Sequence, residues 1–353
     1  MNVREEAVAA PMKLLIEQPV NGESGQVLLR SKLRAVSRRM GFSPVARERM
    51  ELVSNEMVSN QIKFAHAAGM VQIWEVTQPC HAIDLFALDF GLGIANLPAA
   101  LEDGYTTAGT MGKGLGAIRR LANESEFYTV PSGVATGAPW HGMAVWARFY
   151  VKPCVPGSYQ VGQYLRAYQD DVHNGDSICL ETSNGKLRWL HMDGLGHGLQ
   201  AEQVVKGRDD ILGIDAPLKE VMQVLSSRLR GTRGAVGMLA EADAGGGVAR
   251  ICGVGDMAAY LILNGERKNV LFAPGVLGHE HRSFEETELQ FPAQAMLVTG
   301  SDGLRRNWNL SSFPGLWRLH PQLVALLLGQ VMGRGNDDKS IFVLRTSPSK
   351  GEH

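Results

Sequence analysis

A glycine-rich stretch directly after a buried strand sets the strongest limit on how this chain can fold. Residues Asp89 to Gly116 read DFGLGIANLPAALEDGYTTAGTMGKGLG, with glycine clusters at both ends and a polar, Thr-rich segment between them. The apolar run Ala82–Leu88 predicts a buried strand before the stretch, and the residues after it have helical spacing. Glycine lets a backbone approach a ligand closely, and the free N–H groups that start a helix favour an anion. The stretch therefore indicates a cradle for nucleotide phosphates with a mobile cover, or else a long Gly-rich loop without a ligand.

A predicted helix upstream places two polar side chains on one face. Residues 45–66 have helical spacing, and within them Glu56 and Asn60 are four residues apart. Asp89, at the end of the predicted strand, can accept from the exocyclic amine of a base. These residue types could orient a nucleophile, bind Mg²⁺ and read the base in an ATP site. The residues that could approach or close over the nucleotide are Gly91, Gly93, Thr107, Gly112, Lys113, Gly114 and Gly116.

The order of these motifs resembles the GHKL superfamily of ATPases and kinases. Three motifs resemble its N box and its two glycine boxes: Glu56-x-x-x-Asn60, Asp89-x-Gly91-x-Gly93 and Gly112-x-Gly114-x-Gly116. The sequences SNEMVSNQI and DGYTTAG are most similar to the RsbT type of serine/threonine kinase. The resemblance covers roughly residues 10–150 and implies a GHKL (Bergerat) α/β sandwich that binds ATP with Mg²⁺.

The resemblance also implies a role for each residue of the motifs. Glu56 would orient or deprotonate the hydroxyl of the substrate, and Asn60 would bind Mg²⁺. Asp89 would contact adenine, while Lys113 and the second glycine cluster would hold the phosphates. Kinase activity is a further step beyond ATP binding, because a shared fold does not guarantee a shared activity.

The second half of the chain carries aspartates at the ends of apolar runs. Several of them stand beside glycine or serine: Asp176, Asp193, Asp302, Asp337 and Asp338. An aspartate after a strand is often only a turn residue. Carboxylates that converge repel one another unless cations neutralise them, and hard oxygen ligands suit Mg²⁺ or Mn²⁺. Two such ions can generate hydroxide and hold a phosphoryl group for attack.

This pattern resembles the type 2C metal-dependent protein phosphatases. The sequence DGLGHG, which starts at Asp193, is similar to their RsbX/SpoIIE branch, and the resemblance covers about residues 158–346. It implies that Asp193 is catalytic and bridges two Mn²⁺ or Mg²⁺ ions, with help from the carbonyl of Gly194. The remaining metal ligands would be Asp176, Asp302 and Asp337, and Asp338 could exchange roles with Asp337.

Three other residues near these motifs have open or modest roles. His197 could donate to phosphate or pack beneath its loop, and packing is favoured. Asp256, in GlyValGlyAsp, is expected to be a turn residue. The chain departs from the family pattern in one respect, because the start of this half lacks a clear phosphate-binding basic residue; Arg166 is the nearest candidate.

Composition excludes several classes of protein. A net charge of −1 provides no overall field for nucleic acid or an acidic membrane surface. The N-terminus shows no signal peptide, and no apolar run approaches the roughly 20 residues that span a bilayer. The four cysteines are scattered, which argues against a zinc site or a disulfide framework and fits a reducing cytosol. We therefore expect a cytoplasmic protein.

The 353 residues are too many for one typical domain and predict two. We expect residues 1–152 to form an α/β sandwich with helices on one face of a mixed sheet. Residues 158–346 should form an α-β-β-α sandwich of two antiparallel sheets with metals at one edge, and residues 347–353 form a polar tail.

Together, the two resemblances imply a bifunctional regulator of a bacterial stress or sigma-factor switch. It would phosphorylate and dephosphorylate a serine or threonine of a STAS-domain antagonist of an anti-sigma factor, or of a stressosome-like protein. One alternative is a phosphatase whose first domain is an ATP-dependent sensor or binding module. Another is a docking protein without enzymatic activity.

Overall fold

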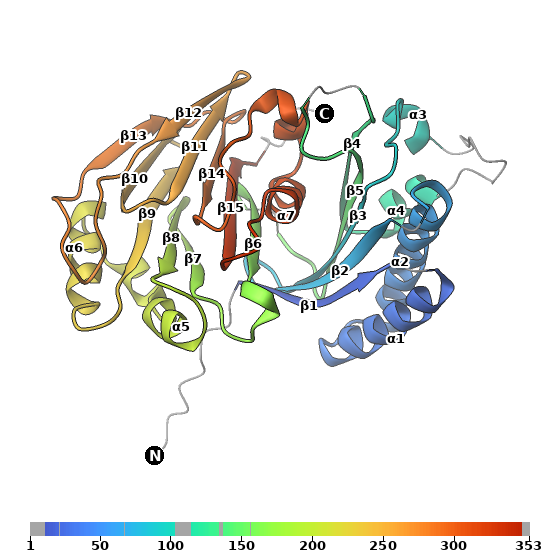
Figure 1. Cartoon of the computed structure of the whole chain (residues 1–353), viewed down its shortest axis with the longest axis horizontal. Coiled ribbons are helices and arrows are strands. Elements are labelled where there is room, and N and C mark those ends of the chain that lie inside the picture. Colours follow the sequence, from blue (N-terminus) through green and yellow to red (C-terminus); the bar gives the residue numbers. More distant parts are fainter. Residues whose placement is uncertain are drawn as a thin grey trace, which may run out of the picture. The chain divides into compact units, whose positions relative to one another are not determined.

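The computed structural model describes residues 11–20, 22–66, 68–102, 114–133, 137–155 and 157–347 (Figure 1). The described residues divide into two compact units. The N-terminal unit contains Met12–Val155 together with Asn309–Leu323, and the C-terminal unit contains the described parts of Pro156–Trp308 and Val324–His353. Within the described residues, no helix is both long and apolar enough to cross a membrane.

The N-terminal unit is built on a five-stranded sheet with the order β1-β2-β3-β5-β4. Its strands are β1 (Met12–Pro19), β2 (Gly69–Val76), β3 (Ala82–Asp89), β4 (Glu124–Val130) and β5 (Gly142–Tyr150). Every neighbouring pair is antiparallel, so the expectation of a mixed sheet is wrong. The connection from β2 to β3 is short, and parallel strands need a crossover of a dozen or more residues.

Helices cover one face of this sheet. They are α1 (Glu23–Arg39), α2 (Pro44–Phe64), the short α3 (Leu97–Leu101) and α4 (Gly114–Leu121) (Figure 1). The N-terminus of α2 is fixed by Ser43, whose hydroxyl accepts from the backbone N–H of Ala46, and by Pro44 in the first turn. Buried apolar side chains such as Met50, Val53 and Met57 point α2 toward the sheet. This packing fixes which face of α2 remains for polar residues.

Residues 309–323 pack on the N-terminal unit, although they lie within the range expected for the second domain. The ring of His320 stacks on Trp146, with 4.5 Å between ring centroids. The guanidinium of Arg148 donates to the side-chain oxygen of Gln322 at 3.3 Å. Trp146 and Arg148 are both buried, so this segment is part of the structure of the unit.

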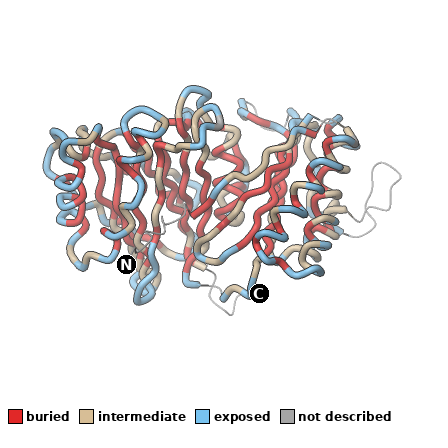
Figure 2. The backbone as a smooth tube through the Cα atoms, turned by 90° about the horizontal axis from the view of Figure 1, so that it is seen from below, coloured by how far each residue is buried: buried red, intermediate tan, exposed pale blue. Residues whose placement is uncertain are grey.

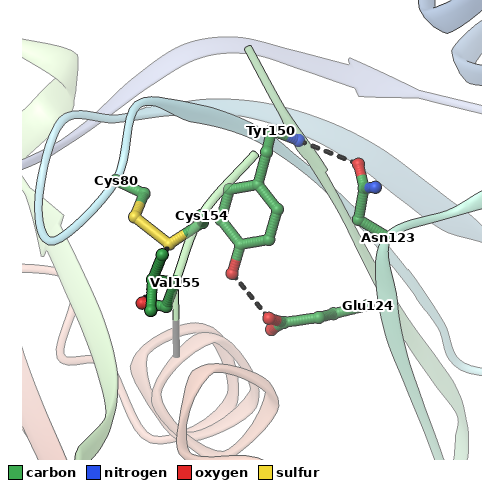
Figure 3. Close-up of a disulfide and its surroundings, with 6 residues drawn as sticks. All are labelled: Cys80, Asn123, Glu124, Tyr150, Cys154 and Val155. Atoms are coloured by element: carbon green, nitrogen blue, oxygen red, sulfur yellow. Dashed lines mark hydrogen bonds between the residues drawn. A yellow bond between two sulfur atoms is a disulfide. The ribbon is translucent and has the colours of Figure 1, made fainter. Parts of the chain in front are cut away.

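A disulfide joins Cys80 and Cys154, so the expectation that the cysteines remain unpaired is wrong for these two (Figure 3). Their Cα atoms are 6.0 Å apart although 74 positions separate them in sequence. The register of β3 and β5 explains the proximity, because Ala82 is paired with Tyr150 and each cysteine lies just beyond that end of the ladder. The other two cysteines, Cys179 and Cys252, are free.

The C-terminal unit contains two five-stranded sheets, with the orders β13-β10-β9-β8-β7 and β12-β11-β14-β15-β6. Their strands are β6 (Tyr159–Arg166), β7 (Asp176–Ser183), β8 (Lys186–Gly194), β9 (Ala235–Asp243), β10 (Val248–Val254), β11 (Ala258–Leu263), β12 (Glu266–Val270), β13 (Glu286–Gln290), β14 (Met296–Gly300) and β15 (Lys339–Thr346). All neighbouring strands in both sheets are antiparallel, which confirms that part of the expectation.

The core of this unit lies between the two sheets. Trp189 of β8 stacks on Phe342 of β15, with ring centroids 5.2 Å apart, and both side chains are fully buried. Figure 2 shows that the strands of both units are mostly buried, whereas exposed residues concentrate on loops and outer helix faces. The sandwich carries the predicted aspartates at or next to the ends of its strands.

Helices cover the outer faces of the sandwich. They are α5 (Leu199–Val205), α6 (Leu218–Arg228) and α7 (Pro321–Val331), with short 3₁₀ turns at Tyr168–Asp170 and Asp209–Gly213. Two further 3₁₀ turns, Leu310–Ser312 and Leu316–Arg318, lie in the segment 309–323 that belongs to the N-terminal unit. Apolar residues of α5 and α6, including Val204 and Val221, pack against Leu190 and Leu239 of the first sheet. On the other sheet, Gly329 of α7 lies against the ring of Tyr164 on β6.

Candidate nucleotide and metal sites

Glu56 and Asn60 lie on α2 directly beside the first residue of α4. A Cβ atom built on Gly114 would lie 2.8 Å from Glu56 Oε2 and 3.4 Å from Asn60 Oδ1. Any side chain at position 114 would therefore press on the Glu56 carboxylate, and glycine lets the backbone of α4 approach both polar groups. The structure brings together these three predicted residues, which come from two of the predicted motifs.

Asp89 ends β3 and is held by backbone groups. Its Oδ1 accepts from the N–H of Gly91 at 2.9 Å and from the N–H of Met143 at 3.1 Å. Burial raises the pKa of Asp89, and these two hydrogen bonds lower it again in part. Among the described residues no partner is recorded for Oδ2, so this oxygen remains for a donor such as an exocyclic amine.

The first glycine turn needs glycine at both of its predicted positions. Gly93 has a φ of 72°, and a Cβ there would lie 2.7 Å from the carbonyl oxygen of Val130. A Cβ on Gly91 would lie 3.0 Å from the Cβ of Ala65, the residue that follows α2. The turn therefore passes close to the C-terminal end of the helix that carries Glu56.

The second glycine motif is only partly within the described residues. Gly114 and Gly116 belong to α4, and Gly116 is buried there. The predicted phosphate-binding residues Thr107, Gly112 and Lys113 lie outside the described residues. The described geometry therefore supports the Glu56, Asn60 and Asp89 side of the proposed nucleotide site.

The predicted aspartates of the C-terminal unit gather at strand ends of both sheets. Asp176 begins β7 and is paired in register with Asp193 near the end of β8. Asp302 follows β14, and Asp337 precedes β15. Burial raises the pKa of Asp193 strongly, and the charges of Asp176, Asp302 and Asp337 raise it further. The four carboxylates are thus close enough to affect one another.

Asp176 is the most enclosed of these acids, with 4% of its surface exposed. Burial raises its pKa, and hydrogen bonds from the hydroxyls of Ser340 and Ser301 oppose that effect. The Ser340 hydroxyl donates to Asp176 Oδ2 at 2.7 Å. A carboxylate held inside the protein in this way is costly unless a cation or donors compensate its charge.

Asp337 and Asp338 have different surroundings, which bears on the choice between them. The two oxygens of Asp338 accept from the backbone N–H groups of Tyr168 at 2.7 Å and Gly175 at 2.8 Å. Among the residues that the structure describes, Asp337 Oδ1 accepts only from the adjacent N–H of Asp338, at 2.9 Å. Asp338 therefore ties two loops together, and Asp337 is the one with coordination capacity to spare.

The types of residue in this cluster suit a hard divalent cation, although the described side chains are too far apart to surround one. Within the described chain, no three His, Cys, Asp or Glu side chains converge closely enough to hold a metal ion. The donor set is nevertheless all oxygen, and mutual repulsion raises the pKa of Asp193 and Asp302 alongside burial. These properties fit Mg²⁺ or Mn²⁺.

The loop that follows Asp193 is closely packed. The backbone N–H of Gly194 donates to the carbonyl of Gly175 at 2.9 Å, and a Cβ on Gly194 would lie 2.8 Å from the carbonyl oxygen of Ala201. The ring of His197 packs on Tyr168, with centroids 5.0 Å apart, which is the packing role favoured for it. Glycine at 194 is therefore required by its neighbours.

The sequence analysis missed an acid and two bases beside the cluster. Asp256 was expected to be a turn residue, but its charge raises the pKa of both Asp193 and Asp302. Arg306 Nη2 lies 3.8 Å from Asp256 Oδ2, and its Nε and Nη2 are buried without a hydrogen-bond partner. The only sequence signal for Asp256 is that GlyValGlyAsp also places an aspartate after a strand.

Arg233 is the second basic residue that the sequence analysis missed. A Cβ on Gly196, in the loop after Asp193, would lie 3.1 Å from Arg233 Nη1. By contrast, Arg166 on β6 directs its Nη1 to Gln330 Oε1 at 3.5 Å. Arg233 and Arg306 therefore border the acidic cluster and offer positive charge that could hold a phosphoryl group.

Comparison with known proteins finds a serine/threonine-protein kinase that is similar to part of this chain. The chain is 30% identical over 98 residues to serine/threonine-protein kinase RsbT from Bacillus subtilis (strain 168), a match that covers 28% of this chain and 73% of RsbT. No family model matches the chain.

Two solved structures are similar to about half of this chain. A chain from the bacterial stressosome, described as a modular system adapted to control secondary messenger signaling, is 26% identical with a TM-score of 0.47 and covers 53% of this chain and 99% of its own. RsbX in complex with magnesium is 17% identical with a TM-score of 0.47 and covers 56% of this chain and 99% of its own.

Proposed function

Since the chain belongs to the family of the serine/threonine-protein kinase RsbT, we propose that it is a bifunctional regulator of protein phosphorylation. Its N-terminal unit would transfer phosphate from ATP to a serine or threonine, and its C-terminal unit would remove it. Two observations carry the proposal. In the N-terminal unit, Glu56 and Asn60 lie beside Gly114. In the C-terminal unit, the charges of several aspartates act on Asp193.

In the kinase reaction, Glu56 would orient the hydroxyl of the substrate and accept its proton. Asn60 would hold Mg²⁺, which, when bound, would neutralise charge on the phosphate oxygens. Asp89 would accept from adenine through Oδ2, because Oδ1 already accepts from two backbone N–H groups. Gly114 supports this arrangement by leaving the Glu56 carboxylate free to face the nucleotide.

In the phosphatase reaction, Asp193, Asp176, Asp302 and Asp337 would hold two Mn²⁺ or Mg²⁺ ions with the carbonyl of Gly194. When bound, the ions would supply a hydroxide nucleophile and neutralise the phosphoryl oxygens. The chain itself would contribute Arg306, which is partly exposed and whose Nη2 lies 3.8 Å from Asp256 Oδ2 beside the acidic cluster, as a contact for the phosphoryl group.

We infer the class of partner from the resemblance to RsbT-type kinases. The proposed substrate is a STAS-domain protein of a partner-switching or stressosome-like system. Joining the two activities in one polypeptide would keep both near the same substrate at a high effective concentration.

The test is to incubate the chain with ATP, Mn²⁺ and candidate STAS proteins and to follow the mass of the STAS protein. Glu56→Ala should stop phosphorylation and leave dephosphorylation intact, and Asp193→Ala should have the opposite effect. Exposed acids in the same units provide matched controls: Glu48→Ala on α2 and Asp215→Ala in the C-terminal unit should change neither reaction.

Other outcomes favour the alternatives. If the wild-type chain never phosphorylates a STAS protein but hydrolyses its phosphoserine form, the N-terminal unit is a sensor or binding module. Binding to a STAS protein with neither reaction would indicate a docking protein and would overturn the enzymatic proposal.

A further inference from the structure

A continuous set of buried hydrogen bonds leads from the interior of the C-terminal unit to Asp176. Thr299 Oγ1 lies 3.0 Å from His191 Nδ1, and His191 Nε2 lies 2.7 Å from Ser340 Oγ. Ser340 Oγ in turn donates to Asp176 Oδ2 at 2.7 Å. Thr299, His191 and Ser340 are each 0% exposed. Solvent therefore has no access to the first three members of this hydrogen-bond chain.

The hydrogen-bond chain crosses between the two sheets three times. Thr299 lies on β14 and Ser340 on β15 of one sheet, whereas His191 lies on β8 and Asp176 on β7 of the other. His191 therefore fills a polar position within a largely apolar interior, and both of its ring nitrogens contact hydroxyls of the opposite sheet. Such groups must be satisfied when buried, which fixes the orientation of each one.

The order of the protons follows from the number of donors that each group has. An ionised Asp176 can only accept, so the single proton of the Ser340 hydroxyl is committed to Oδ2. The Ser340 oxygen must then accept from His191, which places the proton of the neutral imidazole on Nε2. Nδ1 is left as an acceptor and receives the proton of the Thr299 hydroxyl. With Asp176 ionised, one arrangement of the protons gives every group in the hydrogen-bond chain a partner.

We propose that Thr299, His191 and Ser340 are positioning residues for the metal centre, which hold Asp176 in one orientation with Oδ2 occupied. The other oxygen of the carboxylate is then the one that faces a divalent cation or its water. This inference rests on the proposed phosphatase centre and goes beyond it, because it assigns a role to residues that would contact neither substrate nor metal. Outer partners of this kind orient a ligand and tune its affinity for the metal.

The experiment measures Mn²⁺ affinity of the full chain by titration calorimetry. Ser340→Ala should weaken binding about tenfold or more, as expected for loss of an outer partner of a ligand. Ser226→Ala is the matched control, because Ser226 is also buried and its Oγ lies 2.9 Å from His281 Nε2 in the same unit. That variant loses a buried serine–histidine contact elsewhere and should retain the wild-type Mn²⁺ affinity.

A second pair of variants covers the case in which Ser340→Ala does not fold. Thr299→Val removes the hydroxyl at the far end of the hydrogen-bond chain with little change of shape, and it should weaken Mn²⁺ binding. Thr299→Ser keeps the hydroxyl and should restore binding. A purely steric role for Thr299 would predict the opposite order for these two variants and would overturn the inference.

Nitrogen-15 NMR of histidine-labelled protein reads the proton order directly. The inference predicts that His191 is neutral and protonated on Nε2, and a proton on Nδ1 would contradict it. If wild type binds Mn²⁺ and Ser340→Ala binds it equally well, the positioning role is wrong while the proposed phosphatase centre stands. If wild type binds no Mn²⁺, the proposed centre fails and the positioning role fails with it.

Discussion

The proposed nucleotide site of the N-terminal unit depends on having glycine, which has no side chain, at position 114. The absence of a side chain there leaves room for the Glu56 carboxylate, and the same residue starts α4. Because Glu56 Oε2 is the end of a flexible side chain, a methyl group at 114 would displace it rather than disrupt the fold. Binding and folding should therefore respond differently to one substitution.

Gly114→Ala tests whether nucleotide binding and folding respond differently to a substitution at this position. Alanine in a helix is more favourable than glycine by up to about 1 kcal/mol, so the melting temperature should stay the same or rise. The affinity for a non-hydrolysable ATP analogue should fall roughly tenfold, the equivalent of about 1.4 kcal/mol. Calorimetry and thermal denaturation measure the two effects, with Gly157→Ala as a control because no atom lies within 4 Å of its built Cβ. Unchanged ATP affinity in Gly114→Ala would contradict the account.

A buried acid on β9 gives the C-terminal unit a stability that depends on pH. Glu241 accepts from Arg188 at 2.6 Å and from Lys186 at 3.2 Å. Burial opposes its ionisation, but these two partners outweigh burial and hold the pKa of Glu241 below its ordinary value of 4.5. A lowered folded-state pKa stabilises the fold above pH 4.5, and that stability is lost as the pH falls through the lowered value.

Glu241→Gln should remove this dependence. We expect the variant to lose about 1–2 kcal/mol of unfolding free energy at pH 7, as for hydrogen bonds to a charged group. The difference from wild type should shrink as the pH falls below 4.5. Urea denaturation at several pH values measures it, with Glu288→Gln as the control, because Glu288 pairs with Arg250 on the exposed surface. A difference that stays constant with pH would rule out the ion pairs as its cause.

Among the helices and strands of the C-terminal sandwich, α7 and β6 approach each other too closely for a side chain at position 329. A Cβ on Gly329 would lie 2.3 Å from Tyr164 Cγ, inside the ring of a fully buried tyrosine. Neither group can move freely, because Tyr164 is fully buried and its strand β6 is paired with β15 along its whole length. Glycine at 329 is therefore required for the helix to approach the strand.

Gly329→Ala should destabilise the protein by about 1–3 kcal/mol through overpacking, although alanine normally favours a helix. Chemical denaturation of the full chain measures the change. Tyr164→Leu in the same chain should relieve part of the cost of the alanine, and a double-mutant cycle gives the size of that relief. A stabilising effect of Gly329→Ala would show that the helix can shift away from the strand.

Strand periodicity in the sequence located many elements but not all of them. The strand predicted from the apolar run Ala82–Leu88 coincides with β3 (Ala82–Asp89) except for its last residue, because a compact apolar run is a clear strand signal. The strand β6 (Tyr159–Arg166) was missed because it contains buried polar residues such as Gln163, which is 2% exposed. Its burial follows from pairing with β15, which is distant in sequence.

The same limit applies to the candidate sites. The motif aspartates could be predicted because each lies at one end of an apolar run and several stand beside glycine or serine. The contacts of His191 with Thr299 and Ser340 could not, since they cross from one sheet to the other and no sequence spacing records that. The Cys80–Cys154 disulfide escaped prediction for a similar reason, as it depends on the register of β3 and β5.

At the scale of the whole molecule, the N-terminal unit consists of two separate segments of the chain, which affects how it can be isolated as a fragment. Residues 309–323 belong to it although more than 150 residues of the C-terminal unit intervene in sequence. Arg148 and Trp146 lose the partners Gln322 and His320 when this segment is absent. An isolated fragment that ends at residue 155 therefore leaves buried groups without partners, which is costly.

A fragment of residues 12–155 should accordingly be less stable than the same fragment with a peptide of residues 309–323 added. We expect the peptide to raise the melting temperature in a concentration-dependent way, since a ligand that binds only the folded state stabilises it. A peptide in which His320 and Gln322 are replaced by alanine is the control and should have little effect. Full stability of the fragment alone would show that the segment is not needed.

The release of inorganic phosphate from ATP in the presence of a STAS substrate tests the central claim most directly, because continuous release needs both sites in turn. The wild-type chain should release phosphate continuously through cycles of phosphorylation and dephosphorylation. Asp193→Ala should consume one equivalent of ATP per STAS protein and stop, and Glu56→Ala should consume none. Continuous release by Asp193→Ala, or its absence from wild type with every STAS protein tried, would contradict a kinase and a phosphatase acting within one chain.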